Sequence, residues 1–422
     1  MTISITHNHV SEIADDPTKD VSSGEWNAAH TVSGVALLEN GVQYGTDWPT
    51  SPAPQEGMFC YRTDRDVLYL YNGTDWVPIE SFAAMTIYVD PTGTDDADHG
   101  FAFATDAFAT INYALSQIPP LYGGDVVVNI AAGTYTENVA IRGKAPTGPY
   151  TIWIEGTLST AVDTTLTGGG AGVASGSTQA TVVKTSAGWT VDAYKRKLCY
   201  FTSGSNDGLY RVIESNTSNT LTLVGSCLAA TPSSGDAFQI LSHGTVISGT
   251  FQVYCGGLVR NLSVTGTTYA YSGLCHWLRC ALAVFASGPA ATFVSYALLT
   301  CSCTSTGTNT ITPGSVYTPF KDVYATTGSN GTVILQQPGT AVLSYSCVYA
   351  GDGGASPGLV YCRGHHEVLY GGTEMKTILK STTGAGIVAV WGGKFFSRSG
   401  CARVSVTTEY TVESASYSYV AA

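Results

Sequence analysis

The chain has 422 residues, a net charge of −12 and a charged fraction of only 12%, while 44% of its residues are hydrophobic. This hydrophobic content excludes a disordered chain. The negative balance, with a single short basic run at residues 195–197, argues against nucleic acid as a partner. No run of 18 apolar residues and no apolar leader is present, so we expect neither membrane insertion nor a signal peptide.

Because the charged fraction is low, uncharged polar residues must hydrate much of the surface. Soluble domains usually carry roughly 25% charged residues, whereas this chain relies on 48 glycines, 25 tyrosines and abundant serine and threonine. Such a balance is typical of long β-rich assemblies in which part of the surface is buried between subunits.

Two zones precede the first long apolar pattern. Residues 1–35 are polar and weakly periodic, which indicates a connector. Residues 36–82 contain GMFCYRTDRDVLYLYNGTDWVPI, in which alternating apolar positions and Asn72-Gly73 predict an aromatic β-hairpin module with a type I′ turn. The motif GTDW occurs at residues 45–48 and again at 73–76, which suggests paired turns.

The third zone, residues 83–169, reads as strand, helix and strand. We expect Thr105 to cap the helix and the two prolines at 119–120 to end it. Residues 126–130 then form a nearly continuous apolar strand. One face of the helix carries the apolar side chains Phe108, Ile111, Leu115 and Ile118.

The remaining chain is a series of short apolar runs bounded by Gly, Ser, Thr and Pro. Residues 170–244 have tight turns and predict an inserted antiparallel β-barrel or small sandwich. Residues 245–400 repeat apolar runs at the roughly 20-residue spacing of solenoid rungs, and residues 401–422 form a C-terminal β-strand region. A β-sandwich remains an alternative for the runs, and an ordinary βαβ unit for the third zone.

Several segments resemble phage-like tail fibre, tailspike or head spike proteins. The run GTYTENV after the expected helix resembles the entry to a pectin-lyase-like β-helix, and GLYRVIESNTSNTLTL and HNHVSEIADD are similar to segments of virion appendages. The resemblance implies a mainly β fold: a right-handed single-stranded parallel β-helix with an N-terminal helical cap and an inserted antiparallel β-barrel module.

The same resemblance implies a virion protein, assembled in the host cytoplasm, that attaches the particle to a glycan on the host cell surface. It implies a homotrimer that binds other tail, baseplate or head proteins through residues 1–35, and no cofactor. We expect the face formed by Tyr69, Tyr71 and Trp76 to pack on copies of itself. A polysaccharide depolymerase (lyase or hydrolase) and a purely structural connector or head fibre are the alternatives.

Few residues offer acid–base chemistry for a depolymerase, which needs a pair of carboxylates or a basic residue with acidic metal ligands. Between residues 246 and 400 the candidates are Asp352, Arg363, His366 and Glu367. The alternative interpretation is a set of polar turn residues on a solvated edge. We therefore expect binding without cleavage and leave enzymatic activity open.

Two further sets of residues have possible ligand chemistry. His7 and His9 lie two apart, so on one strand they would share a face, and three chains would present six imidazoles to a transition metal. Solvated polar residues are the default interpretation. The eleven cysteines include no CxxC pair, and we expect them to be buried thiols rather than disulfides.

Overall fold

A computed structural model describes the chain at residues 3–5, 30–32, 42–50, 53–162, 180–224, 228–233, 235–271 and in short stretches between 273 and 420. The described part is mainly β, as the sequence predicts, and divides into two compact units, Met1–Glu80 and Ser81–Ala422. In the first unit β1 (Ile3–Ile5) pairs antiparallel with β2 (His30–Val32), and most of the predicted connector lies outside the described residues.

The predicted hairpin module forms the rest of the first unit. Strand β4 (Phe59–Arg62) pairs parallel with β3 (Val42–Gly45) and antiparallel with β5 (Val67–Tyr71), and β6 (Trp76–Ser81) follows. The prediction of a type I′ turn is wrong, because only Gly73 has a positive φ there. Asn72 instead accepts the N–H groups of Thr74 and Asp75 through its side-chain oxygen, which closes an Asx turn.

The two GTDW motifs meet through their tryptophans. The rings of Trp48 and Trp76 stack with centroids 5.6 Å apart, and Tyr69 meets Trp48 edge-on at 4.9 Å. The Arg62 guanidinium lies 4.5 Å from the Trp48 ring centroid and is held by Asp64 at 2.8 Å. Tyr69 is only 2% exposed within a single chain, so this ring does not require the contacts between copies that the sequence suggested.

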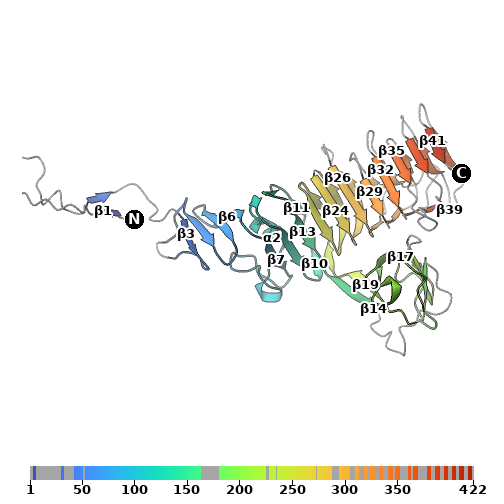
Figure 1. Ribbon diagram of the computed structural model, residues 1–422, viewed down its shortest axis with the longest axis horizontal. Helices are drawn as coiled ribbons and strands as arrows, with labels where there is room; N and C mark the ends of the chain where they lie inside the picture. Colours follow the sequence, from blue (N-terminus) through green and yellow to red (C-terminus); the bar gives the residue numbers. More distant parts are fainter. Residues whose placement is uncertain are drawn as a thin grey trace, which may run out of the picture. The chain divides into compact units, whose positions relative to one another are not determined.

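The second unit is built from coils whose strands align in parallel columns (Figure 1). Val126 of one coil pairs with Ile152 of the next, and Gly257 pairs with Cys275 after that, so successive strands of a column come from successive coils. Column 1 contains β7 (Met85–Val89), β9 (Val126–Ile130), β13 (Ile152–Glu155), β22 (Gly257–Arg260), β24 (Gly273–Leu278), β26 (Val294–Leu299), β29 (Thr318–Lys321), β32 (Ala341–Tyr345), β35 (His365–Val368), β38 (Lys394–Ser397) and β41 (Tyr417–Val420).

The remaining strands form two further columns, 2 and 3. Two long strands, β23 (Leu262–Ala270) and β25 (Ala281–Ser287), belong to both, because each pairs with different neighbours at its two ends. Besides their first halves, column 2 contains β10 (Gly133–Tyr135), β20 (Thr245–Ile247), β27 (Ser302–Thr304), β30 (Tyr324–Thr327), β33 (Val348–Gly351), β36 (Ile378–Ser381) and β39 (Ala402–Val404). Besides their second halves, column 3 contains β11 (Val139–Ile141), β21 (Phe251–Val253), β28 (Asn309–Thr312), β31 (Thr332–Leu335), β34 (Val360–Cys362), β37 (Ala385–Ala389) and β40 (Thr408–Val412).

Residues of all three columns contribute to one continuous core. Trp277 is fully buried and meets Phe251 and Phe285 edge-on, with ring centroids 5.3 and 5.6 Å away. In the described part of the chain eight cysteines are free thiols, and all but Cys255 are buried, which confirms the expectation for these residues. In the residues whose burial the structure describes, the apolar positions of these runs therefore face the core of successive coils.

Three consecutive corners between columns 1 and 2 each contain one residue in the left-handed backbone region. Asn261, Arg279 and Thr300 have φ values of 63°, 54° and 52° and lie at equivalent positions of consecutive coils. Asparagine tolerates this conformation, whereas a β-branched residue is strained there by about 1–3 kcal/mol. Thr300, which is buried, therefore has a strained backbone conformation.

We predict that Thr300→Asn stabilises the second unit by about 1 kcal/mol, because it relieves this strain. The measurement is the midpoint of chemical denaturation. The same substitution at Thr222, a strand residue, serves as the control and should be neutral or destabilising. A midpoint that does not rise in Thr300→Asn would contradict the prediction.

The expected helix is present as α2 (Ile111–Gln117) and buries its predicted apolar face of Phe108, Ile111, Leu115 and Ile118. The prediction that Thr105 caps it is wrong. Residues Ala104–Asp106 form a separate 3-10 turn, η1, and Thr110 caps α2 by accepting the N–H of Tyr113 at 3.2 Å. The reason is Asp95, whose carboxylate accepts the N–H groups of residues 109 and 110 and fixes the chain before the helix.

A charge at Leu115 should unfold the entry of the second unit. Leu115 is 5% exposed and belongs to the core cluster, so Leu115→Asp removes apolar burial and must desolvate a carboxylate, which costs several kcal/mol. We therefore expect Leu115→Asp to lower the melting temperature strongly or to abolish the transition. Ser116→Asp, at the exposed neighbouring position, is the control. An unchanged melting temperature in Leu115→Asp would show that this face is not part of the core.

A six-stranded antiparallel sheet interrupts one coil between β13 and β20. It contains β14 (Leu158–Val162), β15 (Thr181–Val183), β16 (Leu198–Phe201), β17 (Tyr210–Asn216), β18 (Thr220–Leu223) and β19 (Phe238–His243), with the 3-10 turn η2 (Gly204–Asn206). It has its own core around Trp189, Phe201 and Phe238. A smaller apolar cluster joins it to Tyr324 of column 2, and Arg279 lies 4.4 Å from the Tyr210 ring centroid.

His243 marks the return of the chain from this sheet to column 2. Its Nε2 lies 2.9 Å from the carbonyl oxygen of Arg279. Burial lowers the pKa of His243 below its ordinary value, and the hydrogen bond to Arg279 opposes this only in part. The folded chain therefore resists protonation of this ring at a pH where the unfolded chain accepts a proton.

Acidification should destabilise the second unit through His243. Because the folded pKa is lowered, stability is lost as the pH falls below the unfolded value of about 6.5. We expect the melting temperature to fall more steeply between pH 7.5 and 5.5 in the wild type than in His243→Gln, which keeps an N–H donor but cannot take up a proton. Equal slopes in the two proteins would contradict this expectation.

Candidate functional site

The structure places two of the four predicted catalytic residues. His366 and Glu367 are consecutive on β35 in column 1, where they pair with Val342 and Leu343 of the preceding coil. Arg363 and Asp352 lie outside the described residues. Whether the four side chains converge is therefore untested, and a catalytic role for Glu367 stays a prediction.

The predicted metal ligands His7 and His9 also lie outside the described residues. Within the part of the chain that the structure describes, no three His, Cys, Asp or Glu side chains are grouped so that they could hold a metal ion. In the same part no helix is long and apolar enough to cross a membrane.

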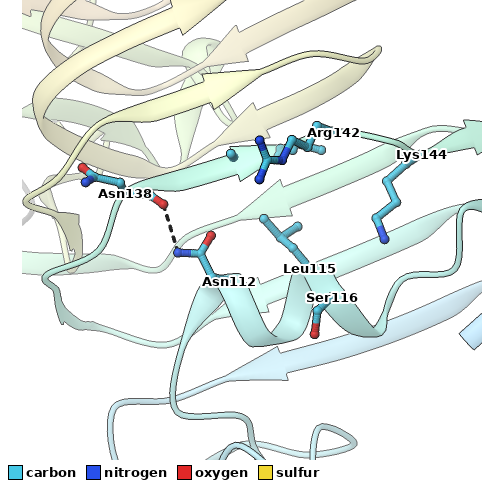
Figure 2. Close-up of a pocket in the computed structure, with 8 residues that line it drawn as sticks. Asn112, Leu115, Ser116, Asn138, Arg142 and Lys144 are labelled. Atoms are coloured by element: carbon cyan, nitrogen blue, oxygen red, sulfur yellow. Dashed lines mark hydrogen bonds between the residues drawn. The ribbon is translucent and has the colours of Figure 1, made fainter. Parts of the chain in front are cut away.

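A cavity of about 440 Å³ lies between α2 and the segment that contains β11. Figure 2 shows Leu115 of the helix pointing toward the strand that carries Arg142, whereas the Ser116 hydroxyl points away from it. The Asn112 side chain closes one end by donating its Nδ2 to the carbonyl oxygen of Asn138 at 2.9 Å. The full lining consists of Asn112, Leu115, Ser116, Asn138, Ala140, Ile141, Arg142 and Lys144.

The predicted GTYTENV run fixes the walls of this cavity. The Glu137 carboxylate accepts the N–H groups of Ile111 and Asn112 at 2.7 and 2.8 Å, which satisfies the free donors at the start of α2. Asn138 Oδ1 accepts the N–H of Thr250 in the next coil at 2.9 Å. This turn therefore connects the helix to two coils. The Glu137 carboxylate, which precedes the cavity in the sequence, is engaged by the helix.

Two cations line the cavity in different states. Arg142 is exposed, and within the described part of the chain its guanidinium has no hydrogen-bond or ion-pair partner. Lys144 is half-buried and donates through Nζ to the carbonyl oxygen of Ile118. Burial lowers the pKa of Lys144, and the Cys255 thiol has a smaller opposite effect. Arg142 is therefore the cation that is available to a ligand.

A pair of tyrosines continues from Arg142 along the outer surface of column 3. Tyr254 donates its N–H to the carbonyl oxygen of Ile141 at 2.8 Å, and Tyr271 donates to Val253 of the preceding coil at 2.8 Å. This register places Arg142, Tyr254 and Tyr271 at equivalent positions of three successive coils. The two tyrosine rings stack with centroids 4.2 Å apart and an interplanar angle of 2°.

Two further side chains widen this surface. Tyr269 lies two residues before Tyr271 on the same face, with the ring centroids 5.8 Å apart. Gln252 accepts the hydroxyl hydrogen bond of Tyr254 at 3.1 Å. We call the set Arg142, Gln252, Tyr254, Tyr269 and Tyr271 the tyrosine strip. Aromatic rings beside hydroxyl and amide groups offer apolar contact and hydrogen bonds to one ligand, as a sugar requires.

The sequence analysis did not find the tyrosine strip. Its signal is the recurrence of Tyr-x-Gly at residues 254–256 and 271–273, where the chain leaves column 3. The coil lengths differ along the chain, so this recurrence becomes visible only after the strand register is known.

No protein-family model matches this chain, and no curated protein sequence matches it. Among solved structures it is similar to the tailspike gp61 of Pseudomonas phage phi297 (11% identity, TM-score 0.19, 73% of this chain and 66% of that one). It is also similar to the tailspike Gp54 of Acinetobacter baumannii bacteriophage AP22, solved with a capsular saccharide of that bacterium (9%, 0.17, 70% and 66%).

The tailspike gp49 of Pseudomonas phage LKA1 is a third similar structure (12% identity, TM-score 0.18, 82% of this chain and 71% of that one). The chain spans 66% of the length of the first two proteins. At these identities and scores the likeness assigns no role to any residue of this chain.

Proposed function

We propose that this chain is a virion appendage of the phage fibre or spike class that binds a glycan on the host cell surface. The observation that carries the proposal is the stacked pair Tyr254 and Tyr271 on the outer face of column 3, in line with the cavity residue Arg142. The sequence resemblances at the N-terminus, at GTYTENV and in the inserted sheet support the assignment to a virion particle.

The proposal includes a more specific fold. In it, the three columns wind as a right-handed single-stranded parallel β-helix of the pectin-lyase-like type, α2 caps its first coil, and the inserted sheet is a small barrel. Single-residue left-handed corners at Asn261, Arg279 and Thr300 and a core shared by all three columns support this arrangement.

The proposed organisation follows from this fold. Residues 1–35 attach the protein to tail, baseplate or head proteins, and residues 36–82 form an aromatic module. The helical cap and first coils occupy 83–169, the inserted module 170–244, the shaft 245–400 and the C-terminal strands 401–422. The assembly is a homotrimer, which would let each particle present several copies of the tyrosine strip and so gain avidity.

The lining of the cavity supports binding rather than cleavage. It contains amides, a hydroxyl and two cations but no carboxylate, whereas hydrolysis of a glycoside requires a pair of acidic groups. A depolymerase would depend on Glu367 with Asp352, Arg363 and His366. A connector or head fibre would need no glycan site at all.

Cell binding tests the proposal directly. Labelled full-length protein is incubated with a panel of encapsulated and capsule-free bacterial strains, and its retention is measured by flow cytometry. We expect retention on a subset of strains, and a several-fold loss in Tyr271→Ala, because an aromatic contact contributes on the order of 1 kcal/mol. Tyr44→Ala, which removes a tyrosine that is 81% exposed in the first unit, is the matched control.

Reducing-end release from the capsular polysaccharide of each retained strain separates the alternatives. Retention without release supports the adhesin. Release of reducing ends that is lost in Glu367→Gln would show that the protein is a depolymerase and not an adhesin. If the protein is retained on no strain, the structural connector is the function that the result supports. Retention that Tyr271→Ala does not change would remove the tyrosine strip from the site.

A further inference from the structure

We infer that the bound glycan is acidic and that Arg142 binds a sugar carboxylate at the rim of the cavity. This inference rests on the proposed function, which requires only that a glycan binds along the tyrosine strip. It adds the charge class of the ligand and the residue that recognises it.

The charge of this surface is opposite to that of the chain. The protein carries 31 acidic and 19 basic residues, yet two of the eight residues that line the cavity are cations and none is acidic. The neighbouring Glu137 carboxylate accepts the N–H groups of Ile111 and Asn112 and forms no ion pair with Arg142. The lining of the cavity is therefore positively charged in a protein whose net charge is negative.

The state of Arg142 indicates a carboxylate. Its guanidinium has no protein partner in the described part of the chain, and arginine stays protonated at any relevant pH. A planar guanidinium binds a carboxylate through two parallel hydrogen bonds, which gives geometric selectivity as well as attraction. Lys144 contributes less, because its Nζ is engaged by Ile118 and burial lowers its pKa.

The position of Arg142 indicates a sugar acid rather than a free anion. Neighbouring strands lie about 4.8 Å apart, so the backbones of Arg142 and Tyr254 are one strand spacing from each other. A sugar bound along the tyrosine pair would therefore extend toward the coil that carries Arg142. Asn112 borders the same cavity, and its side-chain oxygen can accept a hydrogen bond from a sugar hydroxyl while its Nδ2 donates to Asn138.

Carboxyl reduction tests the inference on matched ligands. An array of bacterial polysaccharides, acidic and neutral, is probed with the full-length protein. Each acidic polysaccharide that binds is then reduced chemically so that its carboxylates become primary alcohols. We expect the bound members to be acidic and reduction to weaken binding at least about tenfold, because a charge-assisted bidentate pair is lost.

Arg142→Gln assigns the effect to the proposed residue. It should weaken binding of the native acidic polysaccharide as much as reduction does and should have little further effect on the reduced one. Lys195→Gln, which removes one positive charge from the inserted module, is the control and should change neither. Higher salt should weaken native binding in the wild type and not in Arg142→Gln.

The outcomes separate this inference from the proposed function. Neutral polysaccharides bound through Tyr271 would overturn the acidic ligand and leave the glycan adhesin standing. If reduction abolishes binding but Arg142→Gln has no effect, the role of Arg142 is wrong. If binding weakens only after phosphate substituents are removed, the recognised group is a phosphate and not a carboxylate. Binding of no member would overturn both proposals, as would dissociation of an oligomer by Tyr271→Ala, since the strip would then be an interface between copies.

Discussion

Parallel pairing between successive coils is the constraint on which the second unit depends. Each strand of a column takes its register from the strand before it, so one buried position such as Ile141 fixes Val253 and Ala270 in line behind it. The outward residues that follow, Tyr254 and Tyr271, continue this alignment through backbone hydrogen bonds to Ile141 and Val253. The register set by the core therefore brings the two tyrosine rings together.

The first coil has no coil before it, and a different interaction sets its place. The carboxylates of Asp95 and Glu137 hold the start of α2 from two sides, one from the preceding loop and one from the corner of the next coil. The helix covers apolar side chains that would otherwise meet water, and the same clamp shapes the cavity next to it. One set of hydrogen bonds therefore fixes both the position of the helix and the shape of the cavity beside it.

The sequence predicted what depends on local pattern. The apolar face of α2, the mainly β content and the antiparallel character of the insertion follow from periodicity and turn residues. It failed where a distant side chain decides the local backbone: Asp95 moves the helix cap from Thr105 to Thr110, and the Asn72 side chain replaces a type I′ turn by an Asx turn. The alignment of Tyr254 with Tyr271 could not be predicted from the sequence, because it depends on the strand register and the coils differ in length.

Insertion of the antiparallel sheet leaves the register of the columns intact. Ile152 pairs with Gly257 across the whole insertion, just as Val126 pairs with Ile152 across an ordinary coil. The reason is that Leu158 and His243, at the two ends of the inserted sheet, are themselves paired and return the chain to the point where it left. The coils on either side therefore keep one register, because the first and last strands of the inserted sheet lie side by side and the length of chain between them does not enter the pairing of the columns.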